Sequence, residues 1–580
     1  MKNKKLFNIT AFLLAAFVFG SCTKLDETLY DKVDYNGFLA TKQNVYSMFL
    51  KSFDQGYFSI ANNVFQMQEN PADQFMTPNR EGRWLDGGTY YRLHYHTWTP
   101  QESYISGAWN DIYLGVMQAN NSIEIIQTLD IAKFSITAAE QKEMIAELRT
   151  LRAWNYLRLL DLYRNVPLIT KYKGQTAAEL SAGVPQSTPQ QTYDFIESEL
   201  KSAINDLYTK GDAGTSNFQG RWTKGSAMSL LVRLYLNAKV YIGQEKFKEC
   251  ATVAQDIING KYGSYAIESK WDGIYDWDND KSAESIYAFP STFAYSRWQY
   301  TSGMYWWMSP FKAAPYFEFT DFIDTNPKQS LQPSKDADGK EYTFDLGKPF
   351  SKYQKYSDDI RVKVYKNLGS SKREGMFLYG YLTYNGNKDT VKSSTGYPLY
   401  IRDQVGIYYK TVGGKLITLG PGELTTNKKS DMTSADQNSG VYMTKYPMYP
   451  SNDAHKMEAD YVEIRLAEIY YSLAECKFRE GDKATASVLL NNVRKRYYAT
   501  NSPSLYKTDG SQLTELELMD EWGREFLGEG RRRVDLIRFG KFNSGIWWDK
   551  SPDADNTRSI FPIGQSILNV SSLIKQNPGY

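Results

Sequence analysis

Residues that could carry out catalysis or hold a transition metal are scarce in this chain. It has three histidines and three cysteines among 580 residues, with no His-x-x-x-His pair and no metal-ligand cysteine spacing. No G-x-x-x-x-G-K-[ST], G-x-G-x-x-G or G-x-S-x-G motif occurs. His94 and His96 alternate within "YYRLHYHTWTP", which we interpret as structural or surface histidines at a strand edge. We therefore expect no transition-metal site and no cofactor.

Carboxylates are harder to dismiss. A glycosidase needs only two Asp or Glu at a suitable separation, and 66 acidic residues cannot be sorted into such a pair by sequence. The interleaved acids of "GREFLGEGRRRVDLIRFG" favour internal ion pairs over a basic patch. In "WDGIYDWDNDKSAES" a structural calcium ion is conceivable, but the glycine and terminal glutamate of an EF-hand loop are missing, so we prefer a solvated acidic turn. The carboxylates concerned are Asp272, Asp276, Asp278 and Asp280.

Aromatic side chains are the remaining candidates, and they make up 15% of the chain, with 45 Tyr and 13 Trp. Flat rings flanked by Asp, Asn and Arg suit the CH faces and hydroxyls of sugars. Two stretches fit, "ENPADQFMTPNREGRWLDGGTYY" and "YSRWQYTSGMYWWM", although core packing is the alternative for any single ring. Their candidate contact residues are Asp73, Arg80, Trp84 and Tyr91 in the first stretch, and Trp298, Tyr300, Tyr305, Trp306 and Trp307 in the second.

The N-terminus has the pattern of a secretory signal. "MKNKK" is basic, "LFNITAFLLAAFVF" is apolar, and "GSC" places small residues before Cys22. This arrangement resembles a bacterial lipobox, which implies that Cys22 is lipidated; an ordinary signal peptide is the alternative. Acyl chains would tether the exported protein, since each buried CH₂ contributes roughly 0.8 kcal/mol. No later apolar run approaches the length of a membrane span.

Charge and cysteine usage narrow the class further. Lys plus Arg total 68 and Asp plus Glu 66, a net charge of +2, so nothing favours a nucleic-acid partner. Cys250 and Cys476 lie in helix-like segments and are too few for a disulfide framework. We interpret them as buried free thiols, with a single bridge as the alternative.

The chain is predicted to be mostly α-helical. Residues 146–162 have apolar side chains on two opposed faces, typical of a helix sandwiched between layers. Residues 464–499 form a predicted helix–turn–helix, similar to a tetratricopeptide unit. We divide the chain into a signal peptide (1–21), a lipidated tether (22–40), a helical scaffold with an early binding loop (41–265), an irregular ligand-binding excursion of short strands and turns (266–454), and a C-terminal helical part packed on the scaffold (455–580).

Seven ordered stretches resemble the SusD/RagB family of Bacteroidetes surface glycan-binding lipoproteins. They are "GSC" followed by "LDETLYDKVDYNGF", then "HTWTPQESYISGAWNDIYLGVMQANNSIE", "LRAWNYLRLLDLYRNVPLIT", "RWTKGSAMSLLVRLYLNAK", "EIRLAEIYYSLAEC", "EGRRRVDLIRFGKF" and "FPIGQSILNVSSLIKQNPGY". The resemblance covers the whole length. It implies a scaffold of tetratricopeptide-like helix pairs with an irregular half that bears the ligand site.

The resemblance also implies a non-enzymatic function. Such a lipoprotein lies on the outer-membrane surface, captures oligosaccharide and delivers it to a SusC-like TonB-dependent transporter. Carried over by position, Trp84 is the first expected contact, then Trp298 and Trp306, with Tyr300, Tyr305 and Trp307 secondary; Asp73 and Arg80 are expected to bind hydroxyls. Trp307 is expected to turn into the core, away from Trp306. A peptide or another nutrient as ligand, and a surface glycoside hydrolase, are the alternatives.

Overall fold

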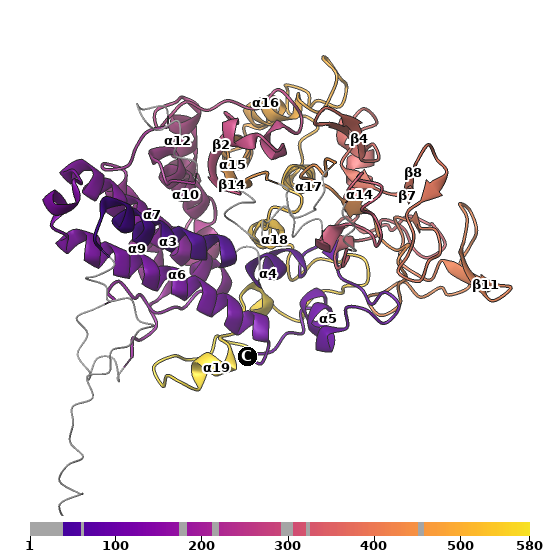
Figure 1. Ribbon diagram of the computed structural model, residues 1–580, viewed down its shortest axis with the longest axis horizontal. Helices are drawn as coiled ribbons and strands as arrows, with labels where there is room; N and C mark the ends of the chain where they lie inside the picture. The colour runs from indigo at the N-terminus through magenta and orange to yellow at the C-terminus, as the bar shows by residue number, and fades with distance from the viewer. Residues whose placement is uncertain are drawn as a thin grey trace, which may run out of the picture.

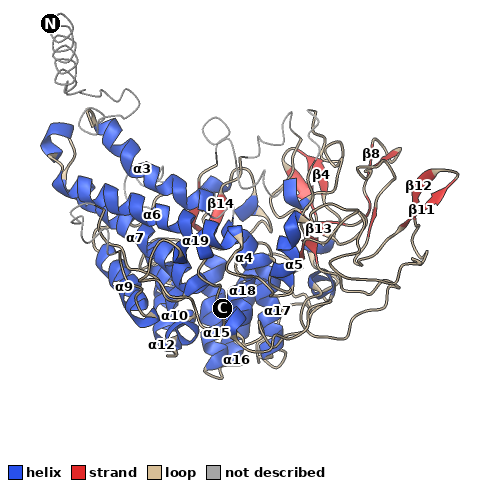
Figure 2. Cartoon of the chain, turned by 90° about the horizontal axis from the view of Figure 1, so that it is seen from below, coloured by secondary structure: helices blue, strands red, loops and turns tan. Residues whose placement is uncertain are grey.

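A computed structural model describes residues 39–59, 63–172, 183–210, 220–291, 306–320, 325–450 and 458–580. The signal segment and Cys22 lie outside these residues, as do Trp298, Tyr300 and Tyr305. The architecture is mostly helical, as predicted, with the helices gathered on one side and the short strands on the other (Figures 1 and 2). None of the helices among these residues is long and apolar enough to span a bilayer.

The N-terminal helices stack in layers. α7 (Ala138–Tyr163) lies between α6 (Ser103–Thr128) and α9 (Pro189–Ala203) and buries side chains on both faces, which confirms the predicted sandwiched helix. A capping box starts it, since Thr137 and Glu140 each accept the other's backbone N–H. The remaining helices of this part are α3 (Lys42–Ser59), α4 (Phe65–Glu69), α5 (Thr89–His94), α10 (Lys224–Leu236), α11 (Ala238–Ile242) and α12 (Phe247–Ile258), with 3-10 turns η2 (Asp86–Gly88) and η3 (Ile131–Phe134).

The C-terminal part continues this stack. α15 (Leu466–Arg479) and α16 (Lys483–Arg494) form the predicted helical hairpin, with Asp482 as N-cap of α16, and α15 also packs against α12. β14 (Tyr461–Arg465), which leads into α15, pairs antiparallel with β2 (Ser285–Phe289). The other C-terminal elements are α17 (Glu515–Glu525), α18 (Arg532–Arg538), η9 (Thr557–Ser559) and α19 (Gln565–Leu568).

The excursion consists of short elements around a second apolar cluster, as its turn-rich sequence predicts. Its strands form small two-stranded antiparallel sheets. β3 (Ser330–Leu331) pairs with β1 (Phe75–Met76) of the scaffold. The other strands are β4 (Lys366–Gly369), β5 (Lys372–Glu374), β6 (Phe377–Leu378), β7 (Gly380–Tyr381), β8 (Thr383–Tyr384), β9 (Asp389–Thr390), β10 (Tyr400–Ile401), β11 (Tyr409–Val412), β12 (Lys415–Thr418) and β13 (Tyr442–Met443). The short helices of the excursion are η5 (Gly273–Tyr275), η6 (Asn279–Lys281), α14 (Pro349–Gln354) and η7 (Ile360–Val362).

Buried ion pairs fasten the excursion to the C-terminal helices. Arg465 donates to Glu525 and Glu529, and Lys445 of the excursion donates to the same Glu529. Burial opposes ionisation of Glu529, but the charges of Arg465 and Lys445 lower its pKa to about 2. Each cation is satisfied by carboxylates or carbonyls, which is what a buried charge requires. The interface therefore depends on charged groups as well as on apolar packing.

The arginines of "GRRRVD" pair internally, as predicted. Arg531 contacts Glu468, Arg532 contacts Asp73, and Arg533 contacts Asp161. The expected solvated acidic turn is only partly correct, because Asp278 and Asp280 are exposed but Asp272 and Asp276 are buried. Lys270 and Arg373 form ion pairs with Asp272, and Lys270 also pairs with Asp276. Across the described ranges no three His, Cys, Asp or Glu side chains group as a metal site would need.

The histidines are structural, but the expected strand edge is wrong. His94 ends α5 and His96 follows it, because the backbone turns at Gly87 and Gly88 and enters a helix. His94 Nε2 lies 2.5 Å from Asp549, and His96 lies between Asp553 and the carbonyl of Pro71. Burial lowers the pKa of His96 to about 4, so it is neutral at pH 7.

Candidate functional site

Backbone pairing connects the first aromatic stretch to a segment that is bonded to the described end of the second, residues 306–308. β1 and β3 pair antiparallel, Phe75 opposite Leu331 and Met76 opposite Ser330. The chain at Trp306 and Trp307 is bonded to the same segment, because their carbonyls accept from the N–H groups of Asn326 and Gln329. Residues 75–91 thus lie beside residues 306–320 and 325–331, more than 200 residues further along the chain. Of the second aromatic stretch only residues 306–308 are described, so its expected part in the site stays a prediction.

The loop that carries Trp84 has an unusual backbone. Glu81, Trp84 and Asp86 have positive φ angles of 56°, 66° and 38°, and the glycines at 82, 87 and 88 are also positive. Left-handed conformations in residues other than glycine cost of order 1 kcal/mol each and gather at ligand sites, where the surroundings hold them. Several hydrogen bonds do so here, from Gly82 N–H to Asn79 Oδ1 and from Glu81 N–H to the Ala435 carbonyl.

Trp84 is half-buried and meets a cation from the neighbouring segment. The ammonium of Lys328 lies 5.3 Å from the centre of the Trp84 ring and 3.4 Å from the hydroxyl of Tyr90. Arg83, which is exposed, stacks its guanidinium 4.9 Å from the centre of the Phe311 ring. We call this group of Arg83, Trp84, Tyr90, Phe311 and Lys328 the Trp84 site. Arg83 is exposed and Trp84 and Lys328 are half-buried, whereas Tyr90 and Phe311 are buried behind them. The site thus places one partly exposed indole beside two donors, a combination that suits a hydroxylated ligand.

Asp73 and Arg80 do not fit the expected role of binding ligand hydroxyls. Asp73 is 0% exposed and accepts two hydrogen bonds from Arg532. Arg80 is also 0% exposed, and its guanidinium donates to Lys328, Ser330 and Ser439. Both side chains are committed to internal partners because they lie beneath the loop. Neither side chain is therefore exposed to a ligand.

The remaining expected residues divide among different surroundings. Trp306 and Trp307 are both half-buried, but Trp307 packs on the main core and Trp306 on the second apolar cluster. The packing of Trp307 agrees with the expectation that it turns into the core, whereas the role of Trp306 as a ligand contact stays a prediction. Tyr91 is half-buried against the main core. Trp298, Tyr300 and Tyr305 lie outside the described residues.

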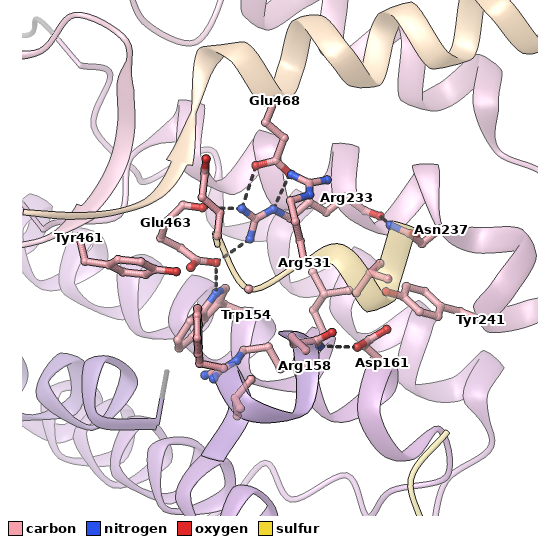
Figure 3. Close-up of a pocket in the computed structure, with 17 residues that line it drawn as sticks. Trp154, Arg158, Asp161, Arg233, Asn237, Tyr241, Tyr461, Glu463, Glu468 and Arg531 are labelled. Atoms are coloured by element: carbon pink, nitrogen blue, oxygen red, sulfur yellow. Dashed lines mark hydrogen bonds and ion pairs between the residues drawn. The ribbon is translucent and has the colours of Figure 1, made fainter. Parts of the chain in front are cut away.

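A polar cavity bordered by the helices and by β14 is another candidate place for a ligand. Figure 3 shows Arg233 between Glu463 and Glu468, with the Trp154 indole N–H donating to Glu463 at 3.1 Å. The cavity measures about 120 Å³, room for a few waters, while drug-sized ligands need roughly 300 Å³ or more. Because its charges pair with one another, we assign it a structural role.

Comparison with known proteins fixes the family. A profile described as "SusD family" matches residues 276–580, more than half of the chain. The chain belongs to the SusD family. A second profile, "Starch-binding associating with outer membrane", matches residues 38–236. The starch-binding protein SusD of Bacteroides thetaiotaomicron is 25% identical over 547 residues, 91% of this chain and 87% of that protein.

Solved structures agree with the fold. A laminarin-binding SusD-like protein superposes with a TM-score of 0.64 at 21% identity, over 93% of this chain and 100% of that one. Surface glycan-binding protein A from Bacteroides fluxus gives 0.61 at 17% identity, over 93% and 100%. These neighbours establish the mostly helical SusD-like architecture.

Sequence reasoning missed part of this SusD-family site. Lys328 stands alone in "TNPKQS", and Phe311 lies in an ordinary apolar stretch, so neither carries a local signal. Arg83 and Tyr90 are inside the first aromatic stretch and could have been found there. The signal for Lys328 is tertiary, because only the β1–β3 pairing places it over Trp84.

Proposed function

We propose that this SusD-family protein is a non-catalytic, lipid-anchored protein of the outer-membrane surface that binds an oligosaccharide or polysaccharide and delivers it to a SusC-like TonB-dependent transporter. The observation that carries the proposal is the Trp84 site on a chain whose family match spans both halves. Relatives named for starch, laminarin and surface glycans support sugar as the ligand class.

The chemistry of the Trp84 site supports a saccharide. Sugars offer CH faces that pack on indole and phenyl rings, and hydroxyls that accept from Arg and Lys donors. Trp84 supplies the partly exposed ring, while Arg83 and Lys328 supply donors beside it. A site for catalysis would need a positioned acid–base pair, and one carboxylate of the loop is occupied, since Glu81 accepts from Tyr397 and Gln437.

Affinity electrophoresis tests the proposal directly. Protein lacking residues 1–22 is run through native gels that contain soluble starch, laminarin, mannan, xylan or pectin, and binding appears as retardation relative to a gel without polymer. Retardation in at least one gel, without release of reducing sugar, is expected. No retardation by any polymer, together with calorimetric binding of a peptide mixture, would overturn the sugar assignment in favour of the peptide alternative.

Anchoring and delivery have separate tests. Cys22→Ser should move the full-length protein from the membrane fraction to the soluble fraction, because the acyl chains provide the anchor. Cross-linking in cells should join the anchored protein to a transporter of the outer membrane, identified by mass spectrometry. Recovery of Cys22→Ser in the membrane fraction would contradict lipid anchoring.

A further inference from the structure

A second aromatic surface lies on the excursion, away from the helices. β7 and β10 pair antiparallel, with Tyr381 directly opposite Tyr400. Their ring centroids are 4.7 Å apart and the ring planes are inclined by 48°, so the two rings form one aromatic surface. Figure 1 shows β7 and its neighbours β8 and β11 at the edge of the molecule opposite the helical stack.

Core packing does not account for this pair. Tyr381 is 43% exposed, while the residues next to these tyrosines, Leu382, Leu399 and Ile401, are almost fully buried in the second apolar cluster. The strands thus place their aliphatic side chains inside and the two tyrosines outside. Tyr400 is half-buried, so the surface consists of one exposed ring with a partly exposed ring beside it. Such an aromatic surface outside the core indicates an interaction site.

The surface is rigid. Arg402 lies beneath it, with its guanidinium 4.7 Å from the centre of the Tyr400 ring, and donates to the carbonyls of Leu419 and Gly420. The backbone N–H of Tyr400 donates to Asn438 Oδ1 at 2.9 Å. A surface fixed before binding loses little conformational entropy when a ligand arrives.

One segment joins this surface to the Trp84 site. Residues 432–440 bond on one side to the start of the Trp84 loop, where Asn79 donates to the Met432 carbonyl and Glu81 to that of Ala435. On the other side the Arg402 N–H donates to the Asn438 carbonyl at 2.7 Å. Tyr397, three residues before Tyr400 and hence about 10 Å away along an extended chain, donates its hydroxyl to Glu81.

We infer that Tyr381 and Tyr400 form a second saccharide platform, which holds a further part of the same polysaccharide chain that is bound at the Trp84 site. The inference rests on the proposed function. We assign a saccharide as the occupant because residues 432–440 connect the two surfaces and because the two phenol rings are paired, with Tyr381 exposed. Two-point attachment raises the affinity for long chains, because the second contact forms at a high effective concentration.

The test compares chain lengths on the same protein. The polymer that retards the native protein in the gel panel is used intact and as short enzymatic fragments, with affinities measured by isothermal titration calorimetry. Tyr381→Ala/Tyr400→Ala should bind the intact polymer roughly tenfold more weakly and the short fragments unchanged. Trp84→Ala should weaken both. Tyr381→Phe/Tyr400→Phe, which keeps the rings, should bind like the native protein.

Tyr172→Ala is the matched control, since Tyr172 is a similarly exposed tyrosine, at 45%. It lies between α7 and α9 in the chain, on the helical scaffold. Circular dichroism confirms that each variant is folded. Equal affinity of the native protein and Tyr381→Ala/Tyr400→Ala for the intact polymer would overturn the second platform while leaving the proposed function in place. A native protein that binds none of the polymers refutes both.

Discussion

Arg532 donates two hydrogen bonds, of 2.7 and 3.0 Å, to Asp73, which stands 459 residues earlier in the chain. Asp73 also accepts the N–H of Gly347 at 2.8 Å. This carboxylate therefore joins the segment before the Trp84 loop to both the excursion and the C-terminal part. Although burial opposes its ionisation, the Arg532 guanidinium lowers the pKa of Asp73 to about 2.

Asp73→Asn should destabilise the protein by about 3–5 kcal/mol at pH 7, because it leaves the buried Arg532 without a counter-charge. The lowered pKa of Asp73 determines how this stabilisation depends on pH. The ionised carboxylate stabilises the folded protein fully above the pKa of Asp in the unfolded chain, about 3.9, and this contribution is lost as pH falls through the folded pKa of about 2. Chemical denaturation of both proteins at pH 7, 4 and 2.5 should therefore show a difference that narrows with acid.

Asp54→Asn is the control, since Asp54 pairs with Lys51 on the surface and should contribute well under 1 kcal/mol. Ligand affinity of folded Asp73→Asn should equal that of the native protein. A stable Asp73→Asn protein with weakened ligand binding would instead return Asp73 to the ligand-contact role that its sequence context indicated.

Trp84→Ala should lower saccharide affinity at least tenfold, about 1.4 kcal/mol, because aromatic anchors dominate binding energies. The melting temperature should change little, since the ring is half-buried on a surface loop. Leu85→Ala, the next residue and 46% exposed, is the control and should bind like the native protein. Equal losses for both variants would mean that the loop's shape, and not the indole ring, determines binding.

Glu69 should make the protein less stable as pH rises from about 5 to 7. Burial raises the pKa of Glu69 to about 7, although the N–H groups of Gly530 and Arg531 donate to its Oε1. Because its pKa is raised in the folded protein, Glu69 is held there in its protonated form. Protonated Glu69 therefore stabilises the fold fully below the pKa of Glu in the unfolded chain, near 4.5, and this contribution is lost as pH rises through 7. Between pH 5 and 8 the native protein should therefore lose about 2–3 kcal/mol of unfolding free energy relative to Glu69→Gln. Melting temperatures of the two proteins measured across this range would show the loss.

The amide group of Glu69→Gln does not titrate, so any stability that it costs is the same at every pH. A change with pH in the stability difference between Glu69→Gln and the native protein therefore reports the titration of Glu69. Glu245→Gln, at an exposed pair with Lys239, should run parallel to the native protein across this range. A difference between Glu69→Gln and the native protein that stays constant from pH 5 to 8 would show that Glu69 keeps an ordinary pKa.

The predictable part of this protein is its local pattern. The two apolar faces of α7 and the hairpin of α15 and α16 follow from spacings within one helix, and the structure has both. The prediction for the α5 region was wrong for a local reason too. The alternation of His94 and His96 resembled a strand, but two glycines with left-handed backbone conformations, at 87 and 88, precede a helix there.

The roles of polar residues near the site could not be predicted, because they depend on distant partners. Asp73 and Arg80 occur in a polar, aromatic stretch typical of a binding loop, yet Arg532 and Ser439 draw them inside. Conversely, Lys328 has no local signal and reaches the Trp84 ring only through strand pairing. Composition located the region, and tertiary contacts decided which of its side chains face outward.

The two thiols should be unreactive in the folded protein. Cys250 and Cys476 are free and 0% exposed, and burial raises the pKa of Cys250, so little thiolate is available. In a variant lacking residues 1–22, Ellman's reagent should therefore detect no thiol under native conditions and both thiols per chain in guanidinium chloride. Absence of thiol in denaturant would reveal a disulfide, and rapid native labelling would mean that the contact between α12 and α15 opens readily.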